Sequence, residues 1–311
     1  MNLKPPYLSI FLNLKKEYLT IFQKTLITQV SLKPFKTIGI GVAFSPNLKA
    51  NLYEAARLSL FFEAKLVMVH IGEQSEDKLK TLKIILNAFK KDNLEYEVVF
   101  KSGNPVDAIL STSQEKNFDL LIIGAAKREN FVKYYVGSIA RKITRQAKCS
   151  LLLLINPSIE RLPCRHIVVN GLEDPKTEQT IASAFYVASK LNAEQLTIVE
   201  EIKQNEIDIK VDDDKSLRHA NIIKAKICNR ENSRINHIIE DLPKAHTTNI
   251  VIKSQPIFGT QGYSIGHYAQ IKRADLLVMN APTKMTFWDR LFPHDIEHIL
   301  TELPTDVLII Q

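Results

Sequence analysis

Apolar residues in the first half of the chain follow two alternating patterns, one typical of buried strands and one typical of helices. Short, nearly continuous apolar runs predict strands covered on both faces, at residues 36–42, 66–71, 96–100, 119–123 and 150–155. Between them, near-helical spacing predicts helices at residues 50–63, 75–91, 105–115 and from 138 onward. Five strands separated by helices, with right-handed connections, predict a doubly wound parallel sheet.

The second half shows the same alternation after a linker at residues 157–163. Predicted strands occupy residues 165–170, 195–200, 249–253, 275–279 and 306–310. Predicted helices occupy residues 177–190, 216–242, 264–272 and 294–303, and we expect the second of these to break near Asn229. The three aspartates at 212–214 are expected to lie in a solvated loop and not in a metal site, since consecutive carboxylates converge poorly on one ion. The fold class is therefore α/β, with two parallel sheets.

The two halves are copies of each other. The segment Asp119-Leu120-Leu121 returns as Asp275-Leu276-Leu277, and Leu152 returns as Leu308, each 156 positions later. Four positions differ most between the copies, where Gly124, Lys127, Gly137 and Ser138 become Asn280, Thr283, Pro293 and His294. These are predicted loop positions, where function is usually carried. The scaffold is repeated and the candidate site is not.

Composition is that of an ordinary globular protein. A length of 311 residues suits about two domains of roughly 150 residues each. Hydrophobic residues make up 45% and charged residues 24%, so we expect both halves to fold. The net charge is +7, but the lysines and arginines are scattered and form no stripe interleaved with aromatic residues. We therefore expect no nucleic-acid partner.

Cysteine usage and hydropathy bear on the compartment. Cys149, Cys164 and Cys228 are odd in number and lack CxxC spacing, which favours inert thiols in a reducing cytoplasm over disulfides or a zinc site. No stretch reaches the roughly 20 apolar residues of a membrane-spanning helix. Residues 1–34 contain an apolar run that ends too early for a signal peptide. We expect a loosely ordered extension, with an amphipathic membrane or partner helix as the alternative.

A ligand of an open parallel sheet binds beyond the carboxyl ends of the strands, where the strand order reverses. In the first half this edge includes Ala43, Ile71 and Gly124. Gly124 leads into a loop that ends at Gly137-Ser138, where a helix is predicted to begin. Glycine allows close backbone approach, Ser138 can cap the helix, and free amides at a helix N-terminus favour a phosphate. These features predict a nucleotide site.

At these positions the chain resembles the universal stress protein family, from about residue 36 to residue 311, as two copies. The resemblance is carried by residues 36–45, Val69-His70-Ile71, Gly103-Asn104-Pro105, residues 119–124, and Gly137-Ser138 with the helix and strand that follow. It implies two five-stranded domains of the adenine nucleotide alpha hydrolase-like type. They would span residues 35–157 and 164–311, with the second degenerate and residues 1–34 as an extension.

ATP-binding members of that family carry an aspartate just after the first strand and a loop of the form Gly-x2-Gly-x9-Gly-Ser/Thr. Here Gly124, Gly137 and Ser138 match the loop, Lys127 replaces its second glycine and Ala43 replaces the aspartate. The resemblance implies that ATP, in the first domain only, contacts these five residues and Val69. Losing a hydrogen bond to a charged group costs about 1.5–3 kcal/mol, which weakens binding about tenfold or more. Lys127 can offset part of this loss as a cation beside the phosphates.

The second copy keeps less of the motif. No glycine stands at its four loop positions, and Pro293 has no amide to offer a phosphate. Leu172 stands at the aspartate position if residues 167–169 align with residues 38–40. We therefore expect no nucleotide there and predict a structural or partner-facing role for this edge.

Two enzymatic alternatives remain. The segment His294-Asp-Ile-Glu297-His298 fits the HxxEH pattern of inverzincin metallopeptidases, in which two histidines one helical turn apart hold zinc. The first copy has none of these residues and no distant third ligand follows, so we expect no metal. A nucleotide hydrolase or transferase of the same fold is the other alternative. The absence of a Walker lysine-serine loop and of a carboxylate at Ala43 weighs against it.

The last strand of each copy is apolar and terminal, at residues 150–155 and 306–310. Unpaired apolar edges invite aggregation, and the family resemblance implies that the two strands pair across an intramolecular pseudo-twofold axis. One chain would then be a built-in dimer. We predict a cytoplasmic, non-catalytic stress-response module whose partners are a nucleotide and, as a second option, another protein.

Overall fold

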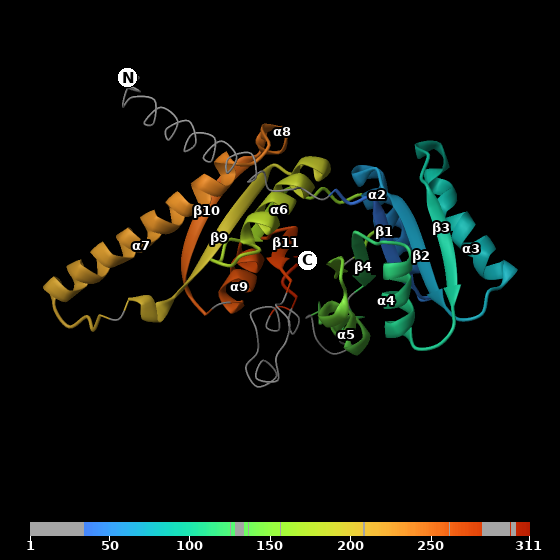
Figure 1. Cartoon of the computed structure of the whole chain (residues 1–311), viewed down its shortest axis with the longest axis horizontal. Helices are drawn as coiled ribbons and strands as arrows, with labels where there is room; N and C mark the ends of the chain where they lie inside the picture. The colour runs from blue at the N-terminus through green and yellow to red at the C-terminus, as the bar shows by residue number, and fades with distance from the viewer. Residues whose placement is uncertain are drawn as a thin grey trace, which may run out of the picture.

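A single ten-stranded sheet runs through the protein. The computed structural model describes residues 34–124, 126–127, 134–135, 137–155, 157–207, 209–260, 262–281, 299 and 303–311. Within these residues the strand order is β10-β9-β8-β11-β12-β7-β4-β1-β2-β3. Figure 1 shows the two halves of the sheet flanking a central junction, close to which the chain ends. The predicted α/β class with parallel, doubly wound sheets is confirmed.

The first half supplies five parallel strands and the helices between them. Its elements are β1 (Thr37–Val42), α2 (Leu48–Phe62), β2 (Lys65–Ile71), α3 (Glu76–Leu86), η1 (Asn87–Asp92), β3 (Tyr96–Lys101), α4 (Pro105–Glu115), β4 (Leu120–Gly124), α5 (Ser138–Gln146) and β7 (Ser150–Leu154). Local sequence explains where helices begin. Asn104 caps α4 by accepting a hydrogen bond from the amide of Val106 at 2.9 Å, with Pro105 as the first helical residue.

The second half repeats this plan with five parallel strands of its own. Its elements are β8 (His166–Asn170), α6 (Thr177–Leu191), β9 (Gln195–Lys203), η2 (Gln204–Glu206), α7 (Asp214–Glu240), α8 (Lys244–Thr247), β10 (Val251–Gly259), α9 (Tyr263–Ile271), β11 (Leu276–Asn280) and β12 (Asp306–Ile310). Ile38 pairs with Leu120 in the first half, and Ile167 pairs with Leu276 in the second. This register aligns Ile167 with Ile38, as expected from the sequence.

The two halves join where β7 pairs antiparallel with β12. The register of this pair is centred on Leu152 opposite Leu308, which are copies of each other at the 156-residue offset. The flanking pairs on either side exchange under the same offset. A register in which a residue faces its own copy is what a two-fold axis through the pair requires. The pairing expected of the two terminal strands is therefore present.

An aspartate has the same structural role in both copies. Asp119 Oδ2 accepts hydrogen bonds from the amides of residues 36 and 37, both at 2.9 Å. Asp275 Oδ2 accepts hydrogen bonds from the amides of residues 165 and 166, at 2.8 and 2.9 Å. Each carboxylate ties the start of the first strand of its half to the start of the fourth. The repeated Asp-Leu-Leu segment is thus explained by architecture.

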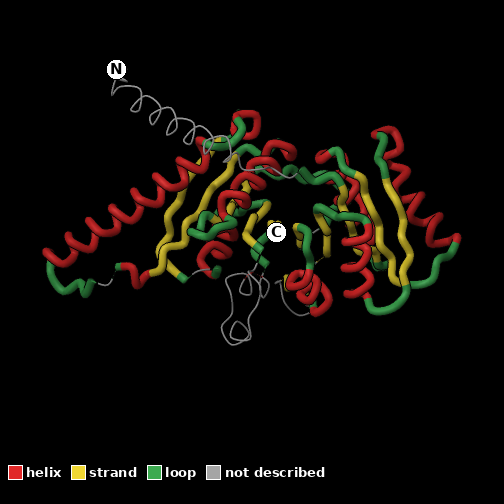
Figure 2. The backbone as a smooth tube through the Cα atoms, viewed as in Figure 1, coloured by secondary structure: helices red, strands yellow, loops and turns green. Residues whose placement is uncertain are grey.

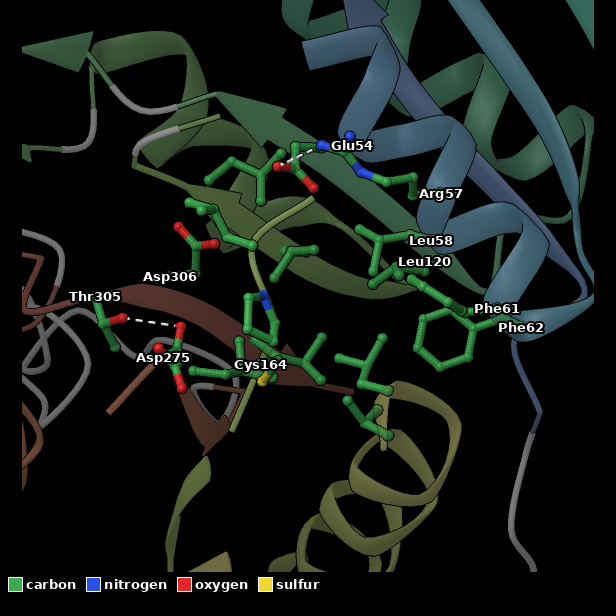
Figure 3. Close-up of a pocket in the computed structure, with 18 of the residues that line it drawn as sticks. Glu54, Arg57, Leu58, Phe61, Phe62, Leu120, Cys164, Asp275, Thr305 and Asp306 are labelled. Carbon is green, nitrogen blue, oxygen red and sulfur yellow. Dashed lines mark hydrogen bonds and ion pairs between the residues drawn. The ribbon is translucent and has the colours of Figure 1, made fainter. Parts of the chain in front are cut away.

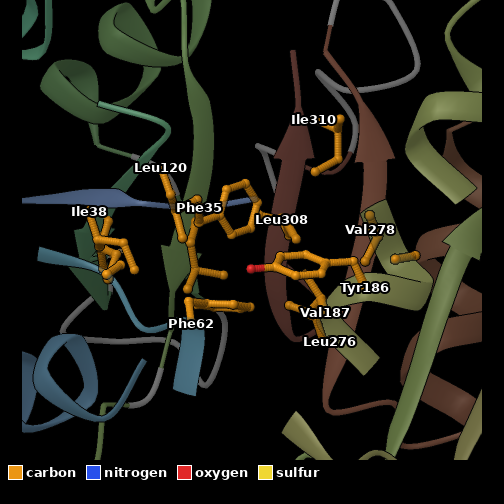
Figure 4. Packing of buried hydrophobic residues seen from close by; sticks show 14 of the residues in the cluster. Phe35, Ile38, Phe62, Leu120, Tyr186, Val187, Leu276, Val278, Leu308 and Ile310 are labelled. Atoms are coloured by element: carbon orange, nitrogen blue, oxygen red, sulfur yellow. The ribbon is translucent and has the colours of Figure 1, made fainter. Parts of the chain in front are cut away.

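Helices cover both faces of the sheet, as Figure 2 shows. One core cluster contains residues of α2, α3, α6 and α7, and the other contains residues of α4, α5 and α9. At the junction, Tyr186 of α6 stacks on Phe62 of α2 with ring centroids 5.6 Å apart (Figure 4). Phe35 meets both rings edge-on, at 5.9 and 5.2 Å. The first core cluster therefore continues from one half into the other.

Helix α7 is unbroken, so the expected break near Asn229 is wrong. The helix continues because Glu231, Ile235 and Ile238, on the turns beyond Asn229, are buried against the rest of the protein. At its start, Asp213 accepts the amide of Ser216 at 2.7 Å in a capping box. The run of three aspartates, expected to be loop, thus supplies the cap of a helix.

Other boundaries differ by smaller amounts. The helix predicted at 75–91 divides into α3 and η1, and β10 extends well beyond the predicted end at residue 253. A hairpin that we did not predict pairs β5 (Ala126–Lys127) with β6 (Tyr134–Tyr135). The helix predicted at 294–303 lies mostly outside the described residues. Among the described helices, none is long and apolar enough to cross a membrane.

Candidate functional site

The carboxyl edge of the first half brings together the predicted residues Ala43 and Gly124. Strands β1 and β4 are parallel neighbours, with Ile40 opposite Ile122. Ala43 follows the last residue of β1 and Gly124 is the last residue of β4, so both lie at the same edge, and both are exposed. The order of strands reverses between β1 and β4, which is where ligands bind in open α/β sheets.

Gly137 and Ser138 form the start of α5 beyond this edge. Gly137 is the N-cap residue, with φ −62° and ψ 165°, and no side chain caps the helix. The first turn contains no acidic residue, and Ser138 is exposed. Among the described residues the start of α5 is therefore uncapped, and the positive end of the helix dipole there favours an anion.

Val69 and the backbone of Lys127 are both held within strands. The backbone of Lys127 pairs with Tyr134 in the β5-β6 hairpin, between the two glycines of the loop. The side chain of Val69 is fully buried in the core cluster beneath α4 and α5. The residue after it, His70, is half-buried, and its Nδ1 lies 2.9 Å from the carbonyl oxygen of Val42. At this edge β2 therefore presents His70 and not the side chain of Val69.

Asn51 is a polar group at this edge that sequence reasoning missed. It lies on α2, and its Oδ1 is buried and has no hydrogen-bond partner in the part of the chain that the structure describes. A Cβ atom placed on Gly124 would lie 3.5 Å from this oxygen, so the Asn51 side chain lies next to Gly124. In the sequence, Asn51 is a polar residue between the apolar positions of helix 50–63. Many exposed helix residues have the same pattern, so it did not single out Asn51.

The equivalent edge of the second half is occupied by its own side chains. Asn280, the copy of Gly124, donates from Nδ2 to Asp174 Oδ1 at 3.3 Å and to Thr177 Oγ1 at 3.2 Å. The hydroxyl of Thr177 also donates to the carbonyl of Leu172, which the sheet register places at the position of Ala43. These bonds join the end of β11 to the start of α6.

Helix α7 adds a second closure there. Arg234 donates from Nη2 to the carbonyl of Gly171, the residue after β8, and from Nε to Glu231 Oε2 at 2.9 Å. Glu231 is buried, and Arg230 donates to its Oε1 at 2.8 Å. Burial alone would raise the pKa of Glu231, but the two guanidinium groups hold it below its usual value. A charged, fully paired cluster therefore lies beside the degenerate edge.

Neither the cysteines nor the zinc-peptidase motif forms a reactive or metal-binding site among the described residues. All three cysteines are free, and burial raises the pKa of the Cys149 thiol to about 11 and that of Cys164 to about 12. Both are therefore neutral and weakly reactive near pH 7. His294, Glu297 and His298 lie outside the described residues, among which no group of three or more metal-ligating side chains occurs.

Comparison with known proteins places this edge in a family. The model of the universal stress protein family matches residues 72–154, which include Gly124, Gly137 and Ser138. A universal stress protein of Helicobacter pylori is 31% identical over 109 residues, covering 33% of this chain and 78% of that protein.

Solved structures show the same fold over most of the chain. A putative universal stress protein from Pseudomonas aeruginosa has a TM-score of 0.66 at 14% identity, covering 91% of this chain and 94% of that one. A universal stress protein from Archaeoglobus fulgidus has a TM-score of 0.64 at 15% identity, covering 88% and 98%. On the strength of the H. pylori relative, the chain belongs to the universal stress protein family.

Proposed function

We propose that this universal stress protein binds ATP at the carboxyl edge of its first half and acts without catalysis as a stress-response regulatory module. Its two domains would be residues 35–157 and 164–311, preceded by an extension at 1–34. The contacts to the nucleotide would come from Ala43, Val69, Gly124, Lys127, Gly137 and Ser138, with Val69 contributing backbone only.

The contrast between the two carboxyl edges carries the proposal. In the first half, Gly137 and Ser138 begin α5 with no side-chain cap and no acidic residue in the first turn. In the second half, Asn280 donates to Asp174 and Thr177, and Arg234 donates to the carbonyl of Gly171. Within the described residues, the first edge presents the uncapped start of α5 to a phosphate, whereas hydrogen bonds between its own side chains cross the second edge. Among these residues the second edge still keeps two buried polar atoms without partners, Asn280 Oδ1 and the hydroxyl of Thr180.

A binding role is favoured over hydrolysis by the residue after β1. Ala43 has no carboxylate, so it cannot hold the adenosine as an aspartate would or orient a water molecule for attack. The buried unpartnered Oδ1 of Asn51 is an acceptor beside Gly124 that a ligand hydroxyl or amine can satisfy. Binding energy is therefore available at this edge, while the position after β1 supplies no carboxylate base.

The arrangement of the two halves supports a pseudo-dimer as the working unit. Strands β7 and β12 pair antiparallel about Leu152 and Leu308, so one chain supplies the two-fold contact that separate copies would otherwise make. A cytoplasmic location agrees with three free cysteines.

Calorimetric titration with ATP tests the proposal. We expect saturable binding by the wild type and at least tenfold weaker binding by Gly137→Asp, which places a negative charge at the positive end of α5. Lys127→Gly restores the glycine of the family motif. Its affinity shows which of the two effects of Lys127 is larger, the crowding of the backbone or the charge beside the phosphates. No heat with either the wild type or Lys127→Gly would refute ATP binding.

A phosphate-release assay on the same samples separates a binding module from a hydrolase. We expect no steady release with the wild type. Steady turnover that is lost in Gly137→Asp would show that the same edge is catalytic and would overturn the non-catalytic assignment. Metal analysis after chelation covers the peptidase alternative, for which the contrary result is stoichiometric zinc that disappears in His298→Ala.

A further inference from the structure

A cavity of about 310 Å³ lies at the junction of the two halves, on the face covered by α2 and α6 (Figure 3). Its wall comes from α2, β4 and β7 of the first half, from α6, β11 and β12 of the second, and from the linker at residues 161–164. Most of the lining is apolar, with Leu58, Phe61, Leu152 and Leu308 as examples. None of the residues assigned to the nucleotide edge lines this cavity.

Two of the charged groups in the wall are engaged by the linker. Arg57 Nη2 lies 2.8 Å from Glu54 Oε1, and the same guanidinium donates to the carbonyls of Ser158 and Ile159. The amide of Ser158 donates to Glu54 Oε1 at 3.2 Å. This pair fastens the linker over α2, and its hydrogen-bonding capacity is largely used there.

Asp306 is different, because half of its carboxylate is free. Its Oδ1 accepts the amide of Ile155 at 2.8 Å, and its Oδ2 has no partner among the residues that the structure describes. Burial, with smaller contributions from the charges of Glu54 and Asp275, raises the pKa of this carboxyl to about 7. No described cation forms an ion pair with the Asp306 carboxylate, so Oδ2 can accept a hydrogen bond from a ligand.

The first half shows that the fold does not need this carboxylate. The copy of Asp306 is Ser150, and its Oγ accepts the amide of Gln311 at 3.4 Å, as Asp306 accepts that of Ile155. A neutral hydroxyl therefore suffices for the structural hydrogen bond at this place. An ionisable group that is strongly perturbed and lines a cavity is a candidate for binding.

We propose that the cavity binds a small molecule with an apolar body of about bicyclic size and a protonated amine head, which donates to Asp306 Oδ2. A cavity of about 150 Å³ holds benzene, so twice that volume suits two fused rings with a short chain. The apolar lining takes the body, and the ammonium group supplies a donor to Asp306 Oδ2 and a charge opposite to those of Asp306 and Asp275.

Calorimetry with three indoles of similar shape tests this assignment at pH 7.5. Tryptamine carries the amine, tryptophol a hydroxyl and indole-3-propionate a carboxylate. We expect one tryptamine per chain, tryptophol at least tenfold weaker because it lacks the charge-assisted hydrogen bond, and no binding of indole-3-propionate.

Variants locate the head and the body. Asp306→Asn keeps the shape and removes the charge, so tryptamine should weaken about tenfold while tryptophol is unchanged. Leu58→Trp fills the cavity from its partly buried wall position and should abolish binding of both, with circular dichroism confirming that the variant folds. Equal affinity for tryptamine and tryptophol, an unchanged Asp306→Asn, or no saturable heat with tryptamine would overturn the proposal.

A competition experiment keeps this cavity distinct from the nucleotide edge. Saturating ATP and the variant Gly137→Asp should both leave tryptamine affinity unchanged, because Gly137 lies outside the cavity wall. Displacement of tryptamine by ATP would place the amine at the nucleotide edge and refute the cavity assignment.

Discussion

Replacing Asp306 with asparagine should stabilise the protein at alkaline pH and have less effect at acid pH. The carboxyl lies at the junction, faced by Glu54 and Arg57 of α2 and by Asp275 at the start of β11. Its folded-state pKa is about 7, against 3.8 for the free side chain, because burial penalises the charged form. Asparagine Oδ1 can still accept the amide of Ile155, so the variant removes the charge and keeps the hydrogen bond.

The sign and size follow from proton linkage. Between pH 3.8 and about 7 the folded state holds a proton that the unfolded state has lost, so raising the pH destabilises the fold. At about 1.36 kcal/mol for each pH unit, the full penalty above pH 7 is about 4 kcal/mol. About 3 kcal/mol of it develops between pH 5 and pH 8, and this is the predicted growth in the benefit of Asp306→Asn.

Urea unfolding followed by circular dichroism at pH 5 and pH 8 measures this difference. Ser150→Ala is the matched control, because it changes the equivalent position of the first half without removing a titrating group, and its effect should be the same at both pH values. A stability difference between Asp306→Asn and wild type that does not change with pH would refute the reasoning. So would greater destabilisation of Asp306→Asn at pH 8 than at pH 5.

Two further predictions concern packing. Arg234→Ala removes donors to Glu231 and to the carbonyl of Gly171, and should lower the free energy of unfolding by about 1.5–3 kcal/mol. The loss should be smaller if Glu231 is also replaced by leucine. An unchanged free energy of unfolding in urea would contradict the closure of this edge. Leu308→Ala, at the centre of the β7-β12 pair and 2% exposed, should cost about 2–5 kcal/mol in the same measurement, and a loss under 1 kcal/mol would show that the junction is loosely packed.

Most of the fold could be predicted because buried parallel strands leave a strong trace in sequence. The apolar runs at 66–71 and 150–155 coincide with β2 and β7, since strands covered on both faces need apolar residues at consecutive positions. The pairing of β7 with β12 was predicted from the family resemblance, together with the two apolar terminal strands that would otherwise be exposed. The predicted helix break near Asn229 was wrong, because the packing of the following turns of α7 outweighs the low helix propensity of asparagine.

The candidate site could be predicted only as far as its glycines. Gly124 and Gly137 lie where the motif spacing indicated, but the sequence pattern did not reveal that Asn51 lies against Gly124 or that a hairpin holds the backbone of Lys127. Whether a polar residue on a helix turns inward depends on the crossing of that helix over the sheet. Asp306 was missed for a similar reason, because Ile155, whose amide it accepts, and the cavity-lining residues of α2 are distant in sequence.

The central claim is that one edge of this duplicated fold accepts a nucleotide and the other does not. Equilibrium dialysis with radiolabelled ATP, at concentrations spanning the calorimetric affinity, counts the sites directly. We predict one ATP for each chain, bound at least tenfold more weakly by Gly137→Asp and with unchanged affinity by Pro293→Asp, the matched change in the second copy. Two ATP molecules for each chain, or loss of binding in Pro293→Asp alone, would contradict the account.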